Sequence, residues 1–183
     1  MSRAPNGERR ALDAYYTPPA LARACLATLA DDIAGARVLE PSCGGGAFVA
    51  AARELGPLAI IGSDIDPAAP GLALCDEAVA GDFLELPERC VDVVVGNPPY
   101  RGAEDHIERA IGMAPVVGML VRLGLLASQK RAGFWNTNPP AEVWVLRERP
   151  SFTGGGTDAT EYMWCVWRAD HIGLPVMRWL SWR

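Results

Sequence analysis

The chain has few of the residues that build metal sites or disulfide frameworks. Its 183 residues include two histidines and five cysteines, and no two cysteines form a CxxC pair. An odd number of scattered cysteines disfavours both a disulfide framework and a zinc site. We therefore expect no metal cofactor and a reducing, cytoplasmic environment.

Long hydrophobic runs are also lacking. Half of the residues are hydrophobic, yet no uninterrupted apolar run reaches the roughly 18 residues that a membrane-spanning helix needs. The first ten residues are polar and charged, without the apolar stretch of a signal peptide. This composition predicts one domain with a hydrophobic core and no membrane partner.

A marked excess of positive charge is missing as well. The formal net charge is −5, which is not typical of a strong nucleic-acid binder. Residues 1–100 carry 14 Asp/Glu against 7 Lys/Arg, whereas residues 101–183 carry 8 against 10. Chance scatter explains this asymmetry as well as a division into an acidic cofactor half and a substrate half that tolerates phosphate.

Apolar strands alternate with helical segments along most of the chain. Helices are expected at 18–30, 47–55, 104–113 and 124–132, and strands at 37–40, 58–63, 78–80, 91–96, 115–123, 142–147 and 162–168. The connection between the last two strands has no room for a full helix, which indicates an antiparallel hairpin. The pattern predicts an α/β fold: a doubly wound, mostly parallel seven-stranded sheet with an antiparallel edge hairpin. Residues 1–13 are expected to form a mobile arm, 14–168 the domain and 169–183 a tail.

The tetrapeptide Asn97-Pro98-Pro99-Tyr100 comes directly after the buried strand expected at 91–96. Open α/β sheets bind their ligands at such carboxyl ends of strands. The Asn97 side-chain oxygen and a backbone carbonyl beside the prolines can both accept hydrogen bonds from one planar NH2 group. The prolines stiffen the loop, and Tyr100 offers a flat face for stacking. The motif indicates methylation of an exocyclic or amide nitrogen, provided that a methyl-donor site is present.

Three other strand ends carry residues suited to a nucleoside cofactor. Residues 44–46 are three glycines that open a helix, where free N–H groups can meet an anion. The dinucleotide spacing GxGxxG is not met because residue 49 is Val49. Asp64 ends the second strand and is suited to accept both hydroxyls of a ribose. Asp82 and Phe83 come after the third strand, where they could contact an adenine ring, although a turn aspartate and a core phenylalanine explain them better when each is taken alone.

Together these segments resemble the S-adenosylmethionine-dependent amino-methyltransferases, most closely the N6-adenine DNA methyltransferases whose cofactor motifs precede the catalytic one. The resemblance covers residues 15–100 and extends beyond them only in strand pattern. It implies a Rossmann-like methyltransferase fold with S-adenosyl-L-methionine as cofactor. The implied cofactor-binding residues are Tyr16, Thr17, Glu40, Pro41, Ser42, Gly44, Gly46, Asp64, Ile65, Asp82, Phe83 and Asn97. The implied catalytic residues are Asn97, Pro98, Pro99 and Tyr100, and Tyr100 and Phe152 are expected to hold the substrate base.

The resemblance implies direct SN2 transfer to the N6 nitrogen of adenine. Hydrogen bonds from both N–H groups, to Asn97 and to the Pro98 carbonyl, would free the nitrogen lone pair and stabilise the developing positive charge. In duplex DNA the base would first have to flip out of the stack. Nucleic acid, with DNA favoured, is therefore the expected partner.

The chain departs from the family in one respect and leaves other substrates open. Sequence-specific members carry a separate target-recognition domain, which we do not expect here. Recognition is then loose, or a second copy or a partner supplies it, or the substrate is something other than long duplex DNA. An RNA amino-methyltransferase acting on adenine or guanine, or a protein glutamine methyltransferase, would use the same Asn97 chemistry. A non-catalytic cofactor-binding subunit is a further alternative, which the intact tetrapeptide at 97–100 disfavours.

Overall fold

The computed structural model describes residues 16–152 and 159–183. Its α-helices are α1 (Pro19–Ala27), α2 (Ala30–Ile33), α3 (Ala47–Arg53), α4 (Ala103–Met113) and α5 (Ala132–Thr137). Its strands are β1 (Arg37–Glu40), β2 (Ala59–Asp64), β3 (Glu77–Ala80), β4 (Val93–Gly96), β5 (Val116–Arg122), β6 (Glu142–Leu146), β7 (Tyr162–Arg168) and β8 (Val176–Leu180). Short 3-10 turns η1 (Pro70–Leu74), η2 (Leu123–Leu126) and η3 (Gln129–Arg131) connect them. Among these residues no helix is long and apolar enough to span a membrane.

The strands form one sheet in the order β3-β2-β1-β4-β5-β7-β6-β8. Neighbouring strands from β3 to β5 pair in parallel, and β7 runs antiparallel to both β5 and β6. The predicted α/β class and the antiparallel hairpin of the last two expected strands are confirmed. The chain order reverses between β1 and β4, so the carboxyl ends of these two strands flank the place where such sheets bind ligands.

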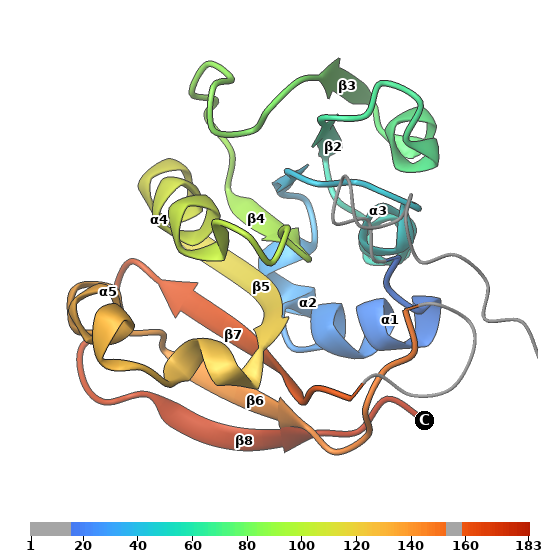
Figure 1. Ribbon diagram of the computed structural model, residues 1–183. Coiled ribbons are helices and arrows are strands. Elements are labelled where there is room, and N and C mark those ends of the chain that lie inside the picture. The colour runs from blue at the N-terminus through green and yellow to red at the C-terminus, as the bar shows by residue number, and fades with distance from the viewer. Residues whose placement is uncertain (1–15, 153–158) are drawn as a thin grey trace, which may run out of the picture.

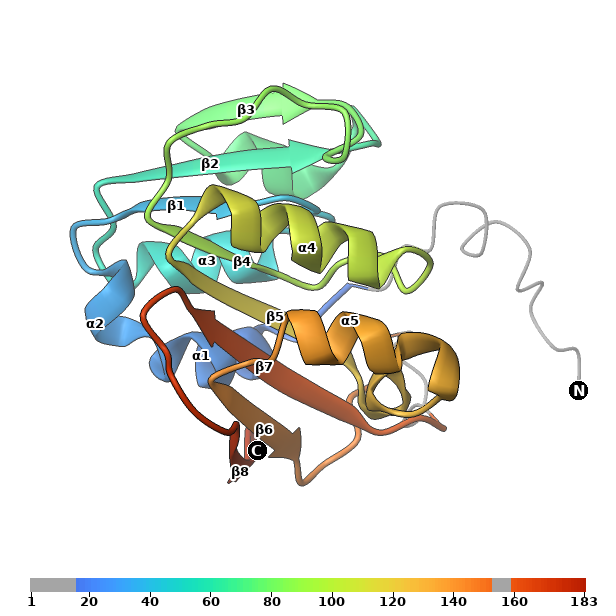
Figure 2. The same cartoon turned by 90° about the vertical axis from the view of Figure 1, so that its left-hand side faces the viewer.

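Helices cover both faces of the sheet (Figures 1 and 2). On one face, α1 and α3 pack on a core that includes the fully buried Trp164, whose ring stacks on Phe48 at 5.7 Å between centroids. On the other face, α4 lies against β5 over a second core that contains Ile107 and Met119. Strands buried on both sides explain the near-continuous apolar sequences of β4 and β5.

The described residues form a sheet of eight strands, whereas the sequence predicts seven. Strand β8 lies within the segment 169–183 that was predicted to be a tail, and it pairs in parallel with β6. Its Met177 and Trp179 side chains are each 59% exposed, so the strand is joined to the sheet through its pairing with β6 more than through burial of its side chains. The sheet therefore continues past Arg168. The predicted mobile arm at 1–13 lies outside the described residues.

Two predicted helices also differ. The helix expected at 18–30 is divided into α1 and α2, and the amide of Thr28 donates to the Cys25 carbonyl at the end of α1. The helix expected at 124–132 is replaced by η2 and η3, and α5 begins only at Ala132. Neither change moves the strand ends that hold the candidate site residues.

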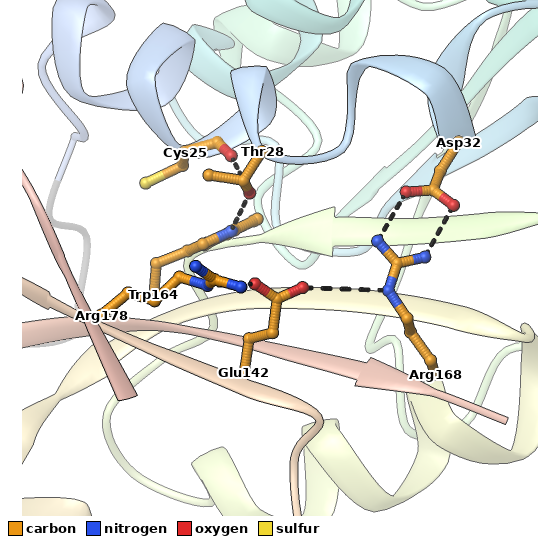
Figure 3. Close-up of polar contacts among 7 residues, drawn as sticks. All are labelled: Cys25, Thr28, Asp32, Glu142, Trp164, Arg168 and Arg178. Atoms are coloured by element: carbon orange, nitrogen blue, oxygen red, sulfur yellow. Dashed lines mark hydrogen bonds and ion pairs between the residues drawn. The ribbon is translucent and has the colours of Figure 1, made fainter. Parts of the chain in front are cut away.

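Polar contacts fasten the last strands to the first helices (Figure 3). Arg168 of β7 makes a two-pronged ion pair with Asp32 of α2, at 2.8 and 2.9 Å. The indole Nε1 of Trp164 donates to the Thr28 hydroxyl at 3.0 Å. That hydroxyl in turn donates to the Cys25 carbonyl. These contacts join segments 136 residues apart and fix the N-terminal helix layer on the sheet.

Candidate functional site

The candidate residues gather at the carboxyl ends of four adjacent parallel strands. Glu40 is the last residue of β1, Asp64 the last of β2 and Gly96 the last of β4, while Asp82 lies shortly after β3. The strand order places these ends in the sequence β3, β2, β1, β4. The topology therefore brings together segments that were predicted separately.

A shallow cavity lies at the switch point between β1 and β4. Its lining includes six predicted site residues: Tyr16, Thr17, Glu40, Ser42, Gly44 and Asn97. Cys43, Gly45, Ala47 and Phe48, all from the expected glycine-rich segment, complete the lining. The N-terminal segment, the glycine loop and the tetrapeptide at 97–100 thus form one site.

The glycine loop is tied to the end of β2. The Gly44 amide donates to one carboxylate oxygen of Asp64 at 2.7 Å, and the Asp66 amide donates to the other at 2.9 Å. Gly46 has a φ of 82° and a Cβ there would lie 2.6 Å from the Leu74 side chain, so glycine is required by both conformation and space. Asp64 holds the loop in this structure and retains the additional lone pairs needed for a ribose.

Tyr16 lies directly on the glycine loop. A Cβ at Gly45 would come within 3.1 Å of the Tyr16 ring, and one at Gly44 within 3.3 Å. The ring remains 50% exposed. The absence of side chains at these two positions therefore lets an aromatic ring form one wall of the cavity.

Glu40 is a buried carboxyl at the base of the cavity, with only 2% of its surface exposed. Burial raises its pKa to about 8, although a hydrogen bond from the Ser42 amide to Oε1 opposes that shift. The negative charge of Asp64 adds to the rise in pKa. Gly96 gives the carboxyl its space, because a Cβ there would lie 2.5 Å from Glu40 Oε1. A cationic ligand would favour the ionised form of this group.

Asn97 is oriented by a residue from the N-terminal segment. Its Nδ2 amide lies 3.2 Å from the Thr17 hydroxyl oxygen, to which it donates. This bond places Oδ1 on the other branch of the amide, and Oδ1 is the acceptor that amino-group chemistry requires. No pattern in the sequence linked these two residues to each other. Pro98 beside them is buried and Pro99 half-buried.

The predicted adenine-contacting pair lies apart from this cavity. Phe83 is buried and lines a separate apolar cavity on the α4 side, with the Arg109 guanidinium carbon 5.4 Å from its ring centroid. Asp82 caps the next turn by accepting from the Leu84 amide at 2.9 Å.

Two further predicted cofactor residues lie next to the ends of β1 and β2. Ile65 is 59% exposed just past the end of β2. Pro41 is buried, and its carbonyl accepts from the Ser63 hydroxyl. The cofactor roles of these residues stay predictions.

Tyr100, which comes shortly after β4, belongs to a group of aromatic residues with Tyr162 and Phe152. Its ring centroid lies 5.9 Å from that of Tyr162, which in turn lies 5.0 Å from Phe152. The guanidinium carbon of Arg122, the last residue of β5, lies 3.8 Å from the Tyr100 ring centroid. Arg122 did not stand out in the sequence, since a single arginine at a strand end carries no pattern.

Phe152 does not present an open face to the cavity. It is 8% exposed and packs on Tyr162 as part of the core. Its role toward a substrate stays a prediction. Arg149 and Arg131, whose charges could contact phosphate, are each held in an ion pair: Arg149 with Glu161 and Arg131 with Glu104.

Comparison with known proteins points to methyltransferases. No family model matches the chain. The chain is 40% identical over 99 residues to a type II methyltransferase of Thermus thermophilus. The aligned part is 52% of this chain and 23% of that protein, so the chain spans about a quarter of that relative's length.

Solved structures show the same architecture. A proposed RNA methyltransferase of Pyrococcus horikoshii superposes with a TM-score of 0.72 at 18% identity, covering 91% of this chain and 92% of the other. The fold is that of the Rossmann-like methyltransferases. A type I restriction-modification methyltransferase subunit of Streptococcus thermophilus superposes with a TM-score of 0.70 at 14% identity, over 86% of this chain and 45% of that one. At these identities the likeness concerns the fold.

Proposed function

We propose that the protein transfers a methyl group from S-adenosyl-L-methionine to an amino nitrogen, with N6 of adenine in DNA as the favoured acceptor. The observation that carries the proposal is the single cavity in which Thr17, the glycine loop and Asn97 meet. The similarity to a type II methyltransferase of Thermus thermophilus supports the same reaction class.

The residues of the cavity fit the donor molecule. Glu40 and Asp64 supply carboxylates near a glycine loop where bulkier residues would clash. A buried carboxyl whose pKa lies near 8 is suited to a ligand with positive charge, because such a ligand compensates the cost of ionising it. In the proposal Tyr16, Thr17 and Ser42 would contact the methionine part of the donor, and Asp64 would accept from its ribose. Ile65, Asp82 and Phe83, which do not line this cavity, would contact the adenine where it extends beyond it.

When bound, the donor supplies a methyl group already activated on a sulfonium sulfur. The chain then has to orient and polarise the acceptor. Asn97 Oδ1 and the Pro98 carbonyl would accept both N–H groups of one amino nitrogen, which frees its lone pair and stabilises the positive charge that develops there. Thr17 keeps the Asn97 amide from rotating, so the acceptor oxygen is held in advance of substrate binding.

The proposed substrate is a nucleic acid base that stacks on Tyr100. Base–aromatic stacking contributes roughly 1–3 kcal/mol per base and offsets part of the cost of flipping a base from duplex DNA. Target recognition by a second copy or by a partner subunit belongs to the same proposal. RNA bases and protein glutamine amides also present a planar NH2 group, and a non-catalytic cofactor-binding subunit would bind the donor alone.

Nucleoside mass spectrometry tests the proposal. The purified chain is incubated with S-adenosyl-L-methionine and unmethylated DNA or RNA, beside Asn97→Ala and a matched control, Asn136→Ala, whose side chain is exposed on α5. N6-methyladenine in DNA that is lost in Asn97→Ala and kept in Asn136→Ala is the expected result. Methylation confined to RNA would show that RNA is the acceptor in place of DNA. Donor binding without any methylated nucleoside would contradict the proposal and favour a protein amide acceptor or a non-catalytic subunit.

A further inference from the structure

The Tyr100 ring is in contact with Arg122, a residue with no part of its own in the proposed methyl transfer. We infer that Arg122 is a positioning residue that holds the Tyr100 ring in place as the platform on which the acceptor base stacks. The inference rests on the proposed function, since it concerns how that site takes its substrate.

The geometry of the pair is that of a cation over a ring face. The guanidinium carbon lies 3.8 Å from the Tyr100 centroid, well within the roughly 6 Å range of cation–π attraction. Both side chains are half-buried, so solvent weakens the attraction less than at an exposed site. A planar guanidinium on an aromatic face restricts the ring more than an aliphatic neighbour would.

The backbone beneath Arg122 is fixed by two neighbouring strands. Arg122 ends β5 and stands opposite Tyr162 of β7 in the antiparallel register. The next amide, that of Leu123, donates to the Glu161 carbonyl at 2.9 Å. On the other side, β5 pairs with β4, which leads directly into the tetrapeptide at 97–100. The guanidinium therefore extends from a rigid position toward the loop that it contacts.

The two faces of the Tyr100 ring then contact different partners: Arg122 on one face and, in the inference, the acceptor base on the other. Because Arg122 covers one face, a base that stacks on the ring has to take the opposite face. Tyr162, whose ring is tilted by 49° at 5.9 Å, supports the ring without stacking flat on it. A ring held in this way loses less conformational freedom when the base binds, so preorganisation improves substrate affinity.

A double-mutant cycle on methyl transfer tests whether Arg122 acts through Tyr100. Initial rates are measured with long unmethylated duplex DNA as the varied substrate for wild type, Arg122→Ala, Tyr100→Ala and the double variant. Arg122→Ala is expected to raise KM for DNA roughly three- to thirtyfold with a smaller change in kcat. When Tyr100 has already been replaced by alanine, Arg122→Ala is expected to raise KM for DNA less than about twofold, because the contact between Arg122 and the Tyr100 ring has already been removed.

Two more variants separate positioning from a general loss of structure or charge. Arg122→Lys keeps the cation but not the planar stack, and partial recovery of KM is expected. Arg23→Ala removes a guanidinium from an exposed pair with Glu54 on another part of the surface, and KM should stay near the wild-type value. Equal effects of Arg122→Ala in both Tyr100 backgrounds would overturn the inference, as would an effect on KM for the donor alone. A wild-type chain that neither binds nor methylates DNA would overturn the proposed function, and this inference with it.

Discussion

The Asn97 amide donates to the hydroxyl of Thr17, a residue 80 positions earlier in the chain. The bond joins the segment before α1 to the loop after β4, and both line the same cavity. An amide that is held from the side of its nitrogen keeps its oxygen in a defined direction. The N-terminal segment thus takes part in orienting the proposed catalytic residue.

Thr17→Val replaces the hydroxyl by a methyl group of similar size. A hydrogen bond of this kind contributes about 1 kcal/mol, so we expect kcat for methyl transfer to fall roughly fivefold. Steady-state rates measure the effect, and Thr17→Ser, which keeps the hydroxyl, should stay within about twofold of wild type. An unchanged kcat in Thr17→Val would show that Asn97 is oriented without this bond.

The Glu40 carboxyl makes stability depend on pH in a predictable direction. Its pKa is raised from 4.5 to about 8 in the folded chain, so the folded state binds more protons than the unfolded state between these values. The contribution is therefore favourable at low pH and is lost as pH rises through that window. One pKa unit corresponds to about 1.4 kcal/mol, so the full shift implies a loss of a few kcal/mol.

Glu40→Gln removes this titrating carboxyl, so a comparison of the variant with wild type separates its contribution from that of all other groups. We expect the free energy of unfolding of the variant, measured relative to that of wild type, to increase from pH 5 to pH 8 in the absence of donor, because only the wild type loses stability over that range. Urea unfolding at both pH values measures it. If the free energies of unfolding of variant and wild type differ by the same amount at pH 5 and at pH 8, the raised pKa of Glu40 is contradicted. The variant should also bind S-adenosyl-L-methionine more weakly, since it lacks the carboxylate.

Gly96→Ala introduces a methyl group where the structure has no space for one. The new Cβ would lie 2.5 Å from Glu40 Oε1 and 3.4 Å from Pro41 Cδ. Overpacking of this kind costs roughly 1–3 kcal/mol, and the displaced carboxyl should weaken donor binding as well. Thermal unfolding and calorimetric titration with the donor measure both effects. Gly112→Ala is the matched control, because a Cβ there meets nothing within 4 Å, and wild-type donor affinity in Gly96→Ala would refute the clash.

Thr28→Val removes the acceptor of the buried Trp164 indole. Trp164 is fully buried, and its Nε1 donates to Thr28 at 3.0 Å. A buried donor left without its partner costs roughly 1–3 kcal/mol, so the free energy of unfolding should fall by that amount. Thr137→Val is the control, because Thr137 is exposed on α5 and bonds only its own helix. Equal stability of the two variants in urea unfolding would show that the indole finds another acceptor.

Local sequence determined the strands of the parallel half and the residues at their carboxyl ends. The apolar stretch that forms β4 leads into Asn97, Asp64 ends β2, and the glycine loop comes after β1, all as expected. These features depend on short-range rules: buried parallel strands are apolar throughout, and ligand-facing residues lie at their carboxyl ends. The order of the motifs along the chain was enough to predict one shared edge.

Tertiary structure alone decided which residues touch. It placed Thr17 on Asn97, stacked Arg122 on Tyr100, and buried Phe152 against Tyr162. It also added β8 to the edge of the sheet, where pairing with β6 supplies the hydrogen bonds although most of the β8 side chains are exposed. Such contacts join segments far apart in the chain, and their geometry depends on how whole strands and helices pack, which no local pattern of residues encodes.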